Sequence, residues 1–285
     1  MWATFSQPEP SISFRKLLSA ADPSINHLQA TTISSKLPIE TSTMTWEYSD
    51  ISKMIDHALL KPTLTRTDLE AGCLMARAYD IASVCIMPFA VKHCAELLAD
   101  SAVAPSTTIG FPHGASATSS KVQQSETALA DGCRELDMVV NISKVLSGDW
   151  KYVQQEIKAV VDTAHALKQR VKVIFETCYL NNTQKIRLCE ICGEANADWV
   201  KTSTGFGTGG ATIEDLRLMR GHAPDSVQIK ASGGIRDLET LLPVRDIGVT
   251  RIGTSSTQVI LDEARKQLNL PAIDSSTAAV SGGDY

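Results

Sequence analysis

The fold is decided by residues 171–204, VKVIFETCYLNNTQKIRLCEICGEANADWVKTST, in which two β-rich runs flank one helical segment. The runs VKVIFETCYL (171–180) and DWVKTST (198–204) contain the branched and aromatic residues typical of buried strands. The segment NTQKIRLCEICGEA (182–195) carries apolar residues at spacings of three and four, which predicts a helix. Residues 171–204 therefore predict one strand–helix–strand repeat.

The same alternation continues in both directions and makes eight strand-like runs. In chain order these are IDHALL (55–60), IASVCIMP (81–88), TTIGFP (107–112), ELDMVVNI (135–142), VKVIFETCYL (171–180), DWVKTST (198–204), VQIKASG (227–233) and TRIGTSS (250–256). Eight such repeats predict an α/β protein with one (β/α)8 TIM barrel. An open, doubly wound sheet is the alternative, but it usually has a glycine-rich turn after its first strand. Here the glycine-rich turns follow the last three runs, where barrels often bind phosphate.

The two ends of the chain differ from the barrel in composition. Residues 1–44 are rich in Ser and Thr without a sustained apolar period, so we expect a flexible N-terminal extension. Residues 272–285 are expected to form a flexible C-terminal tail. The barrel is then expected over residues 45–271, close to the ~250 residues typical of this fold. No secretory signal is expected.

Composition and charge exclude several classes of function. The 285 residues are 43% hydrophobic with a net charge of -5, and no apolar run is long enough for a transmembrane helix. We therefore expect no membrane binding and no nucleic-acid partner. Seven cysteines cannot all pair within one chain, which favours a reducing, cytoplasmic setting, or a mitochondrial one if residues 1–44 are a transit peptide. We expect no metal, since Cys189 and Cys192 lack a second pair, and no cofactor, since no dinucleotide or Walker motif is present.

Two lysines occupy matching places on neighbouring strands. Lys201 and Lys230 are 29 residues apart, which is one repeat, so we expect their ammonium groups about 5 Å apart. At an effective dielectric of 20 their repulsion is about 3 kcal/mol, so one lysine should be partly neutral near pH 7. A neutral amine attacks carbonyl carbon. The alternative is that both lysines end their strands in solvent or pair with acids.

Further charged or reactive side chains interrupt the strand-like runs. Asp137 lies on the fourth run and can meet Lys201 across the barrel, where it would hold a cation, move protons or form a structural salt bridge. Lys172 and Asp56 either line the same pocket or lie exposed at strand starts. Cys85, near the end of the second run, is a further candidate for the pocket.

The three glycine-rich turns are STGFGTGG (203–210), ASGGIR (231–236) and GTSS (253–256). Glycine lets backbone N–H groups converge on an anion, and Ser or Thr hydroxyls add donors. These turns predict a phosphate site, although tight turns that need positive φ would also use glycine. The expected phosphate and substrate contacts are Thr204, Gly205, Ser232, Gly233, Gly234, Ser255 and Ser256.

From about Ile51 to Gln267 the chain resembles deoxyribose-phosphate aldolases, which are class I (Schiff-base) aldolases with a (β/α)8 barrel. The resemblance rests on IDHALLKP (55–62), VCIMP (84–88), TIGFPHG (108–114), ELDMVVNI (135–142), KVIFETC (172–178), ADWVKTSTGF (197–206), KASGGIR (230–236) and RIGTSS (251–256). It implies that Lys201 is the Schiff-base lysine, Lys230 the second active-site lysine and Asp137 the proton-relay aspartate.

The resemblance also implies a reaction and partners. The expected reaction is reversible cleavage of 2-deoxy-D-ribose 5-phosphate to D-glyceraldehyde 3-phosphate and acetaldehyde, by a dimer or tetramer. Some relatives place a C-terminal tyrosine over the site, which makes Tyr285 a candidate. Ala58 departs from the IDHTLL common in relatives and lacks a hydroxyl group that could contact substrate. The rival hypotheses are a Schiff-base aldolase for another phosphorylated sugar and a barrel that binds a sugar phosphate without catalysis.

Overall fold

The structure is a computed structural model that describes residues 46–273. Eight parallel strands pair in chain order and close into a barrel. They are β1 (Ile55–Leu59), β2 (Ser83–Ile86), β3 (Ala104–Ile109), β4 (Glu135–Val139), β5 (Arg170–Ile174), β6 (Trp199–Lys201), β7 (Gln228–Ser232) and β8 (Arg251–Thr254). The expected (β/α)8 barrel is confirmed. The open sheet is wrong, because β8 pairs with β1.

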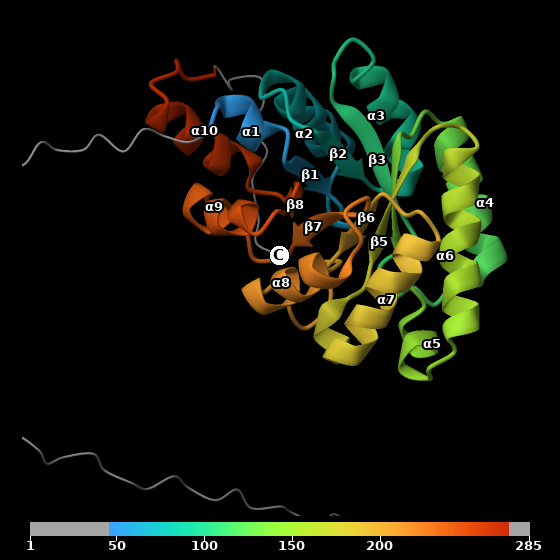
Figure 1. Cartoon of the computed structure of the whole chain (residues 1–285). Coiled ribbons are helices and arrows are strands. Elements are labelled where there is room, and N and C mark those ends of the chain that lie inside the picture. The colour runs from blue at the N-terminus through green and yellow to red at the C-terminus, as the bar shows by residue number, and fades with distance from the viewer. Residues whose placement is uncertain (1–45, 274–285) are drawn as a thin grey trace, which may run out of the picture. The chain divides into compact units, whose positions relative to one another are not determined.

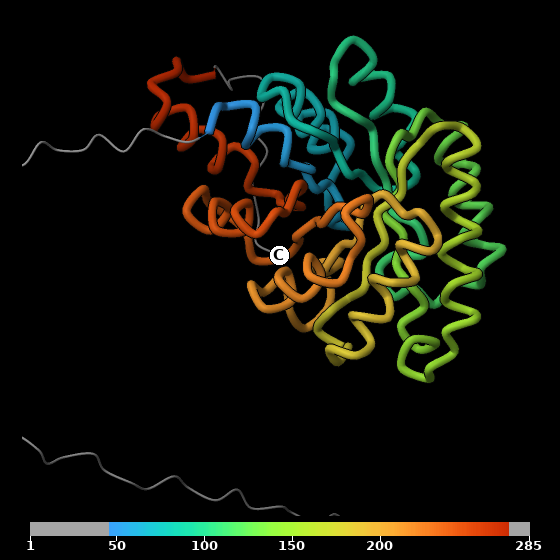
Figure 2. Tube along the Cα trace, in the orientation of Figure 1, coloured from blue at the N-terminus to red at the C-terminus, as the bar shows by residue number. Residues whose placement is uncertain are grey.

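Helices connect the strands and surround the barrel (Figure 1). They are α1 (Tyr48–Ser52), α2 (Arg66–Ala78), η1 (Pro88–Ala90), α3 (Val91–Leu97), α4 (Thr118–Ala130), α5 (Ile142–Leu146), α6 (Trp150–His165), η2 (Thr177–Tyr179), α7 (Asn182–Glu194), α8 (Ile213–His222), α9 (Leu238–Asp246) and α10 (Thr257–Gln267). Figure 2 shows the trace circling once, so that α1 in blue lies beside α10 in red.

Helices follow the sequence expectations more closely than strands do. The predicted helix 182–195 is α7, which begins with a capping box between Asn181 and Gln184. The predicted strand 135–142 is too long, because β4 ends at Val139 and α5 begins at Ile142. Strand β3 begins at Ala104 rather than at residue 107, and Pro105, which has no ladder N–H, concealed this start.

The strands separate an outer apolar layer from a polar and charged barrel interior. Neighbouring residues of a strand point to opposite faces. In β4, Leu136 and Met138 belong to the apolar core, whereas Glu135 and Asp137 are buried charged residues. The register aligns Asp137 with Lys172 of β5, so the charges of adjacent strands share one face of the sheet. The apolar core therefore lies between sheet and helices, and the charged side chains of these strands lie inside the barrel.

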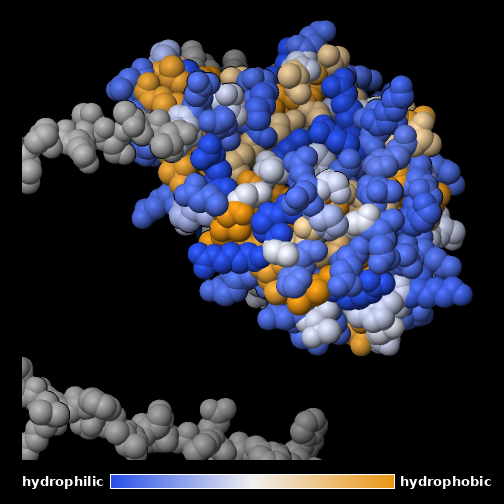
Figure 3. All heavy atoms as spheres, in the orientation of Figure 1, coloured by the Kyte–Doolittle hydropathy of each residue, from blue (hydrophilic) through white to orange (hydrophobic). Residues whose placement is uncertain are grey.

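The outer surface agrees with this division. Figure 3 shows mainly hydrophilic side chains over the helices on this face, with scattered hydrophobic ones between them. Within residues 46–273, no helix has the length and apolarity needed to cross a bilayer. The expected N-terminal extension, residues 1–44, and Tyr285 lie outside the described residues, and of the expected tail only 272 and 273 are described. The domain boundaries stay predictions.

A buried ion pair fixes the end of β4 from outside the barrel. Lys121 of α4 donates to Glu156 of α6 at 2.7 Å and to the carbonyl of Val139 at 2.7 Å. Glu156 also accepts from the N–H of Asn141 at 2.9 Å. Both charged side chains are fully buried. Two helices thereby hold the segment that follows Asp137.

We predict that Lys121→Ala lowers the free energy of unfolding by about 3–5 kcal/mol, because it leaves the Glu156 carboxylate buried without its cation. Urea unfolding measures the loss. Lys158→Ala is the control, since it removes an exposed ion pair of α6, the helix that carries Glu156, and should cost less than about 1 kcal/mol. Equal costs for the two variants would contradict a role for Lys121 in holding this segment.

Candidate active site

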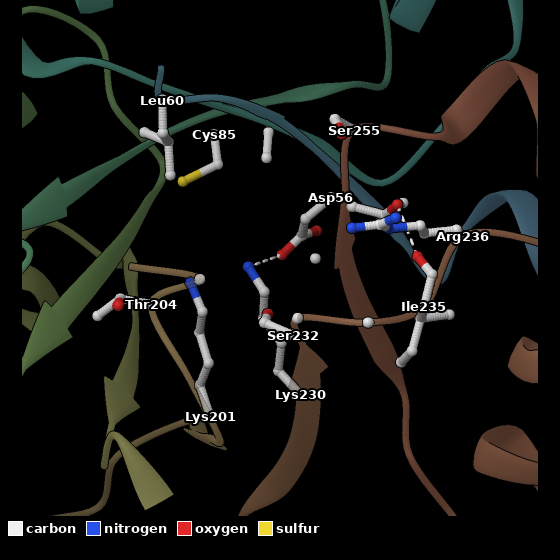
Figure 4. A pocket seen from close by; sticks show the side chains of 16 residues that line it. Asp56, Leu60, Cys85, Lys201, Thr204, Lys230, Ser232, Ile235, Arg236 and Ser255 are labelled. Carbon is white, nitrogen blue, oxygen red and sulfur yellow. Dashed lines mark hydrogen bonds and ion pairs between the residues drawn. The ribbon is translucent and has the colours of Figure 1, made fainter. Parts of the chain in front are cut away.

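A pocket opens at the carboxyl ends of β1, β2, β6, β7 and β8 (Figure 4). The space is about 600 Å³, counting its open mouth. Its lining residues are Asp56, Ala58, Leu60, Cys85, Lys201, Thr204, Gly205, Lys230, Ser232, Gly233, Gly234, Ile235, Arg236, Gly253, Thr254 and Ser255. This is the end of the barrel at which enzymes of this fold place their active sites.

The two predicted lysines meet at one carboxylate oxygen. Strand register places Lys201 directly beside Lys230. Lys201 donates to Oδ2 of Asp137 at 2.7 Å, and Lys230 donates to the same atom at 2.8 Å. Because both bonds end on one atom, the distance between the two Nζ atoms cannot exceed the sum of these two distances. Figure 4 shows both side chains reaching into the pocket from adjacent strands.

A second layer of charges lies beneath the lysines. Lys172 forms ion pairs with Asp56 at 3.0 Å, with Glu135 at 2.6 Å and with Asp137 at 3.0 Å. Arg251 contacts Asp56 at 2.6 Å and Glu135 at 2.9 Å. Lys172 is fully buried and does not line the pocket, so it supports the site from below.

The charges in this buried network do not balance if every group is ionised. Among the buried groups, Asp56, Glu135 and Asp137 supply three carboxylates, whereas Lys172, Lys201, Lys230 and Arg251 supply four cations. Arg170, whose side chain is about half exposed, contacts Glu135 from the solvent side at 2.6 Å. The buried groups become neutral when one lysine loses its proton, whereas the charge of the half-exposed Arg170 is screened by water. Lys172 contacts three carboxylates and Lys230 contacts two, but Lys201 contacts only Asp137 among the described residues. Lys201 is therefore the lysine with the least support for its charge.

The pKa directions follow from these contacts. Burial lowers the pKa of Lys201, and the charge of Lys230 lowers it further against the opposing effect of Asp137. Burial acts in the same sense on Lys230, but Asp137 and Asp56 hold its pKa above the usual lysine value. For Asp137, burial favours the neutral acid, yet the cations of Lys172, Lys201 and Lys230 keep its pKa below the usual range. The site therefore pairs a cationic lysine with one poised to be a neutral amine.

The side of the pocket away from Lys201 and Lys230 consists of backbone N–H and hydroxyl donors. Gly233 and Gly234 both have positive φ, of 84° and 91°, so the tight-turn explanation for their presence also holds. Helix α10 begins at Thr257, directly after Ser255 and Ser256. The positive end of its dipole favours an anion there. Arg236 also lines this side.

Most predicted pocket residues line the pocket. Those that do are Asp56, Cys85, Lys201, Thr204, Gly205, Lys230, Ser232, Gly233, Gly234 and Ser255. Asp137 lies just below, and Ser256 lies outside the lining, with its N–H donating to Thr254 Oγ1 at 3.0 Å. Burial raises the pKa of Cys85, so this side chain is a thiol at neutral pH. Ala58 also lines the pocket, so the missing hydroxyl group noted above falls at the site itself.

Three buried charged residues near the site were not predicted. Glu135 and Arg251 carry the lower layer of the network. Glu135 lies two residues before Asp137, so the period of two that places Asp137 inside the barrel would also have placed Glu135 there. Glu176 accepts hydrogen bonds from Thr204, and no sequence pattern indicated this contact.

Comparisons with known proteins agree with this geometry. The profile of the DeoC/LacD family aldolases matches residues 51–250. A deoxyribose-phosphate aldolase from Rhodopirellula baltica is 59% identical over 237 residues, covering 83% of this chain and 98% of that protein. One from Thermococcus gammatolerans is 48% identical over 218 residues, covering 76% of this chain and 97% of that protein.

Solved structures share the fold. The aldolase QR15 has a TM-score of 0.73 and 40% identity, and covers 78% of this chain and 99% of its own. A tetrameric deoxyribose phosphate aldolase from Aeropyrum pernix has a TM-score of 0.72 and 29% identity, covering 78% of this chain and 93% of its own. The profile match and the identity to full-length relatives show that this chain belongs to the DeoC/LacD aldolase family.

Proposed function

We propose that this protein is a class I aldolase that reversibly cleaves 2-deoxy-D-ribose 5-phosphate to D-glyceraldehyde 3-phosphate and acetaldehyde. The observation that carries the proposal is the shared contact of Lys201 and Lys230 with one oxygen of Asp137, at the floor of a pocket. The names of the relatives support the substrate.

The first step uses the neutral amine of Lys201. Its Nζ attacks C1 of the open-chain sugar, and loss of one water gives an imine, which is protonated to an iminium ion. Lys230 stays charged, because Asp56 and Asp137 both contact its Nζ. The division of labour between the two lysines follows from their different numbers of carboxylate partners.

The second step breaks the C2–C3 bond. A base removes the proton of the C3 hydroxyl group, the C3–O bond becomes a carbonyl, and the bond electrons flow into the iminium ion to leave an enamine on Lys201. Glyceraldehyde 3-phosphate departs, C2 of the enamine is protonated, and water hydrolyses the resulting iminium ion to release acetaldehyde. Asp137 and Lys230 would move these protons through water, since both lie within hydrogen-bond distance of one another beside Lys201.

The phosphate group would bind at the opposite side of the pocket. Gly233, Gly234 and Ser255 line that side, next to the start of α10, and Gly205 also lines the pocket. Binding there would point C1 of the sugar toward Lys201. The phosphate contacts would orient the substrate and add binding energy without touching the reacting carbons.

We also propose a homo-oligomer, because the Aeropyrum pernix relative is described as tetrameric. Light scattering during size exclusion should give at least twice the mass of one chain. A single-chain mass at micromolar concentration would contradict this proposal.

Borohydride trapping tests the nucleophile. Acetaldehyde with borohydride should add one ethyl group, and peptide mass mapping should place it on Lys201, because Lys201 is the least supported cation in the pocket. Lys201→Ala should prevent trapping and reduce turnover at least about a thousandfold. Lys144→Ala, at an exposed lysine, is the control for non-specific labelling.

Labelling of Lys230 instead of Lys201 would overturn the assignment of roles. Absence of any adduct in the folded protein would favour the non-catalytic sugar-phosphate barrel. Faster turnover of ketose phosphates than of deoxyribose phosphate would favour the other Schiff-base aldolase.

The pH dependence of trapping tests why Lys201 is neutral. A lysine is nucleophilic above its pKa, and burial and Lys230 place the pKa of Lys201 below the usual lysine value of 10.5, so trapping should rise with pH and level off below that value. Lys230→Met removes the neighbouring cation, so its trapping curve should shift to higher pH. An unshifted curve, or one that shifts to lower pH, would contradict the proposed effect of Lys230.

A further inference from the structure

One buried carboxyl group beside the pocket has no part in the reaction described above. Glu176 lies two residues after the end of β5, is 2% exposed and does not line the pocket. Its backbone has φ of 56° and ψ of 64°, which is left-handed. That conformation is costly for a residue with a Cβ atom and persists where surrounding contacts maintain it. The contacts of Glu176 therefore indicate what it does.

The carboxyl group of Glu176 holds the beginning of the β6–α8 loop. Its Oε1 accepts from the N–H of Thr204 at 3.2 Å, and its Oε2 accepts from the Thr204 hydroxyl. The Thr204 hydroxyl in turn accepts from the N–H of Phe206 at 3.0 Å. A chain of hydrogen bonds thus runs from Glu176 through Thr204 to Phe206 and encloses Gly205.

The rest of the loop rests on the same group and then joins β7. A Cβ atom added at Gly207 would lie 3.0 Å from Cδ of Glu176, so the loop backbone passes directly over the carboxyl group. Farther along, the N–H of Ala211 lies 3.0 Å from the carbonyl of Ser232 and 3.1 Å from that of Gly233. The loop is fastened at Glu176 and at the β7 turn, and Gly205 lies between these two points.

The backbone of Lys201 is held independently of this clamp. Its backbone carbonyl accepts from the N–H of Phe175 at 2.9 Å, and the N–H of Thr202 donates to the carbonyl of Lys230 at 3.1 Å. These bonds belong to the strand ladder and hold the nucleophile from both sides. Loss of the Glu176 contacts would therefore move the Gly205 turn and leave Lys201 in place.

We propose that Glu176 is a positioning residue that clamps Thr204 and thereby sets the Gly205 turn against the phosphate end of the substrate. The inference rests on the proposed function and deepens it, since it assigns selectivity for the phosphorylated sugar to a residue outside the pocket. It also gives Thr204 a different role from the one predicted, because its N–H and hydroxyl are already used by Glu176 and Phe206.

Kinetics on two substrates test this proposal. In Glu176→Ala the KM for deoxyribose 5-phosphate should rise about tenfold or more, the effect of losing hydrogen bonds to a charged acceptor. The KM for unphosphorylated 2-deoxyribose and the rate of acetaldehyde trapping should change less than about twofold, since neither uses the phosphate end. Glu176→Gln keeps an acceptor for Thr204 and should raise the KM for the phosphorylated sugar less than about threefold.

Three further variants separate the clamp from other effects. Thr204→Val removes the partner hydroxyl, so its effect on KM should not add to that of Glu176→Ala. Glu176→Gly relieves the left-handed backbone but should behave like Glu176→Ala in kinetics. Glu194→Ala removes an exposed carboxylate of α7 and should leave both KM values unchanged.

Other results would contradict either the clamp or the proposed function. An equal rise of both KM values in Glu176→Ala, or no rise in either, would overturn the clamp. If the alanine variant does not fold, Thr204→Val applies the same test, because it removes the hydroxyl group that donates to Glu176. Wild-type protein that traps no acetaldehyde and cleaves no deoxyribose 5-phosphate would contradict the proposed function itself, whatever the variants do.

Discussion

The site depends on one carboxylate oxygen that two lysines share. Oδ2 of Asp137 lies 2.7 Å from the Nζ of Lys201 and 2.8 Å from the Nζ of Lys230. This arrangement requires a closed barrel, because only closure brings the inward faces of β4, β6 and β7 to a common centre. The apolar residues on the outward faces stabilise the barrel that makes the contact, and the ion pair outside β4 secures the chain that follows Asp137.

The excess of buried cations determines which of the lysines can lose its proton. Buried charges are tolerated when they are paired, and an unpaired one favours its neutral form. Three carboxylates compensate three of the four buried cations, and the lysine with one partner is the one that can lose its proton at least cost. The lower layer of Lys172 and Arg251 matters to the chemistry because it occupies Asp56 and Glu135. With those two acids already engaged, Lys201 has Asp137 alone.

Much of this arrangement can be predicted from particular residues of the sequence. Lys201, Lys230 and Asp137 stand out because they break apolar strands at matching places, and strand register then determines which face they share. Glu135 and Arg251 carry the same signal but begin their strands, where a charge on the sequence alone suggests solvent. For the same reason the sequence leaves open whether Lys172 lines the pocket or lies in solvent. Its full burial follows from the closure of the barrel.

The role of Glu176 could not be predicted from the sequence. Its contact with Thr204 depends on a left-handed backbone and on a loop that folds back over it, and neither leaves a periodic pattern. Strand ends were misplaced for a related reason. Local propensity continues through residues such as 140 and 141, whereas β4 ends at Val139, the last residue paired with β5, and α5 begins at Ile142.

The most direct test of the account is the protonation state of the two lysines near pH 7. A neutron structure locates the hydrogens on each Nζ, and NMR of lysines labelled with ¹⁵N at Nζ reports the same property in solution. The charge balance predicts two hydrogens on Lys201 and three on Lys230 and Lys172. Three hydrogens on Lys201, or a neutral Lys230, would contradict it.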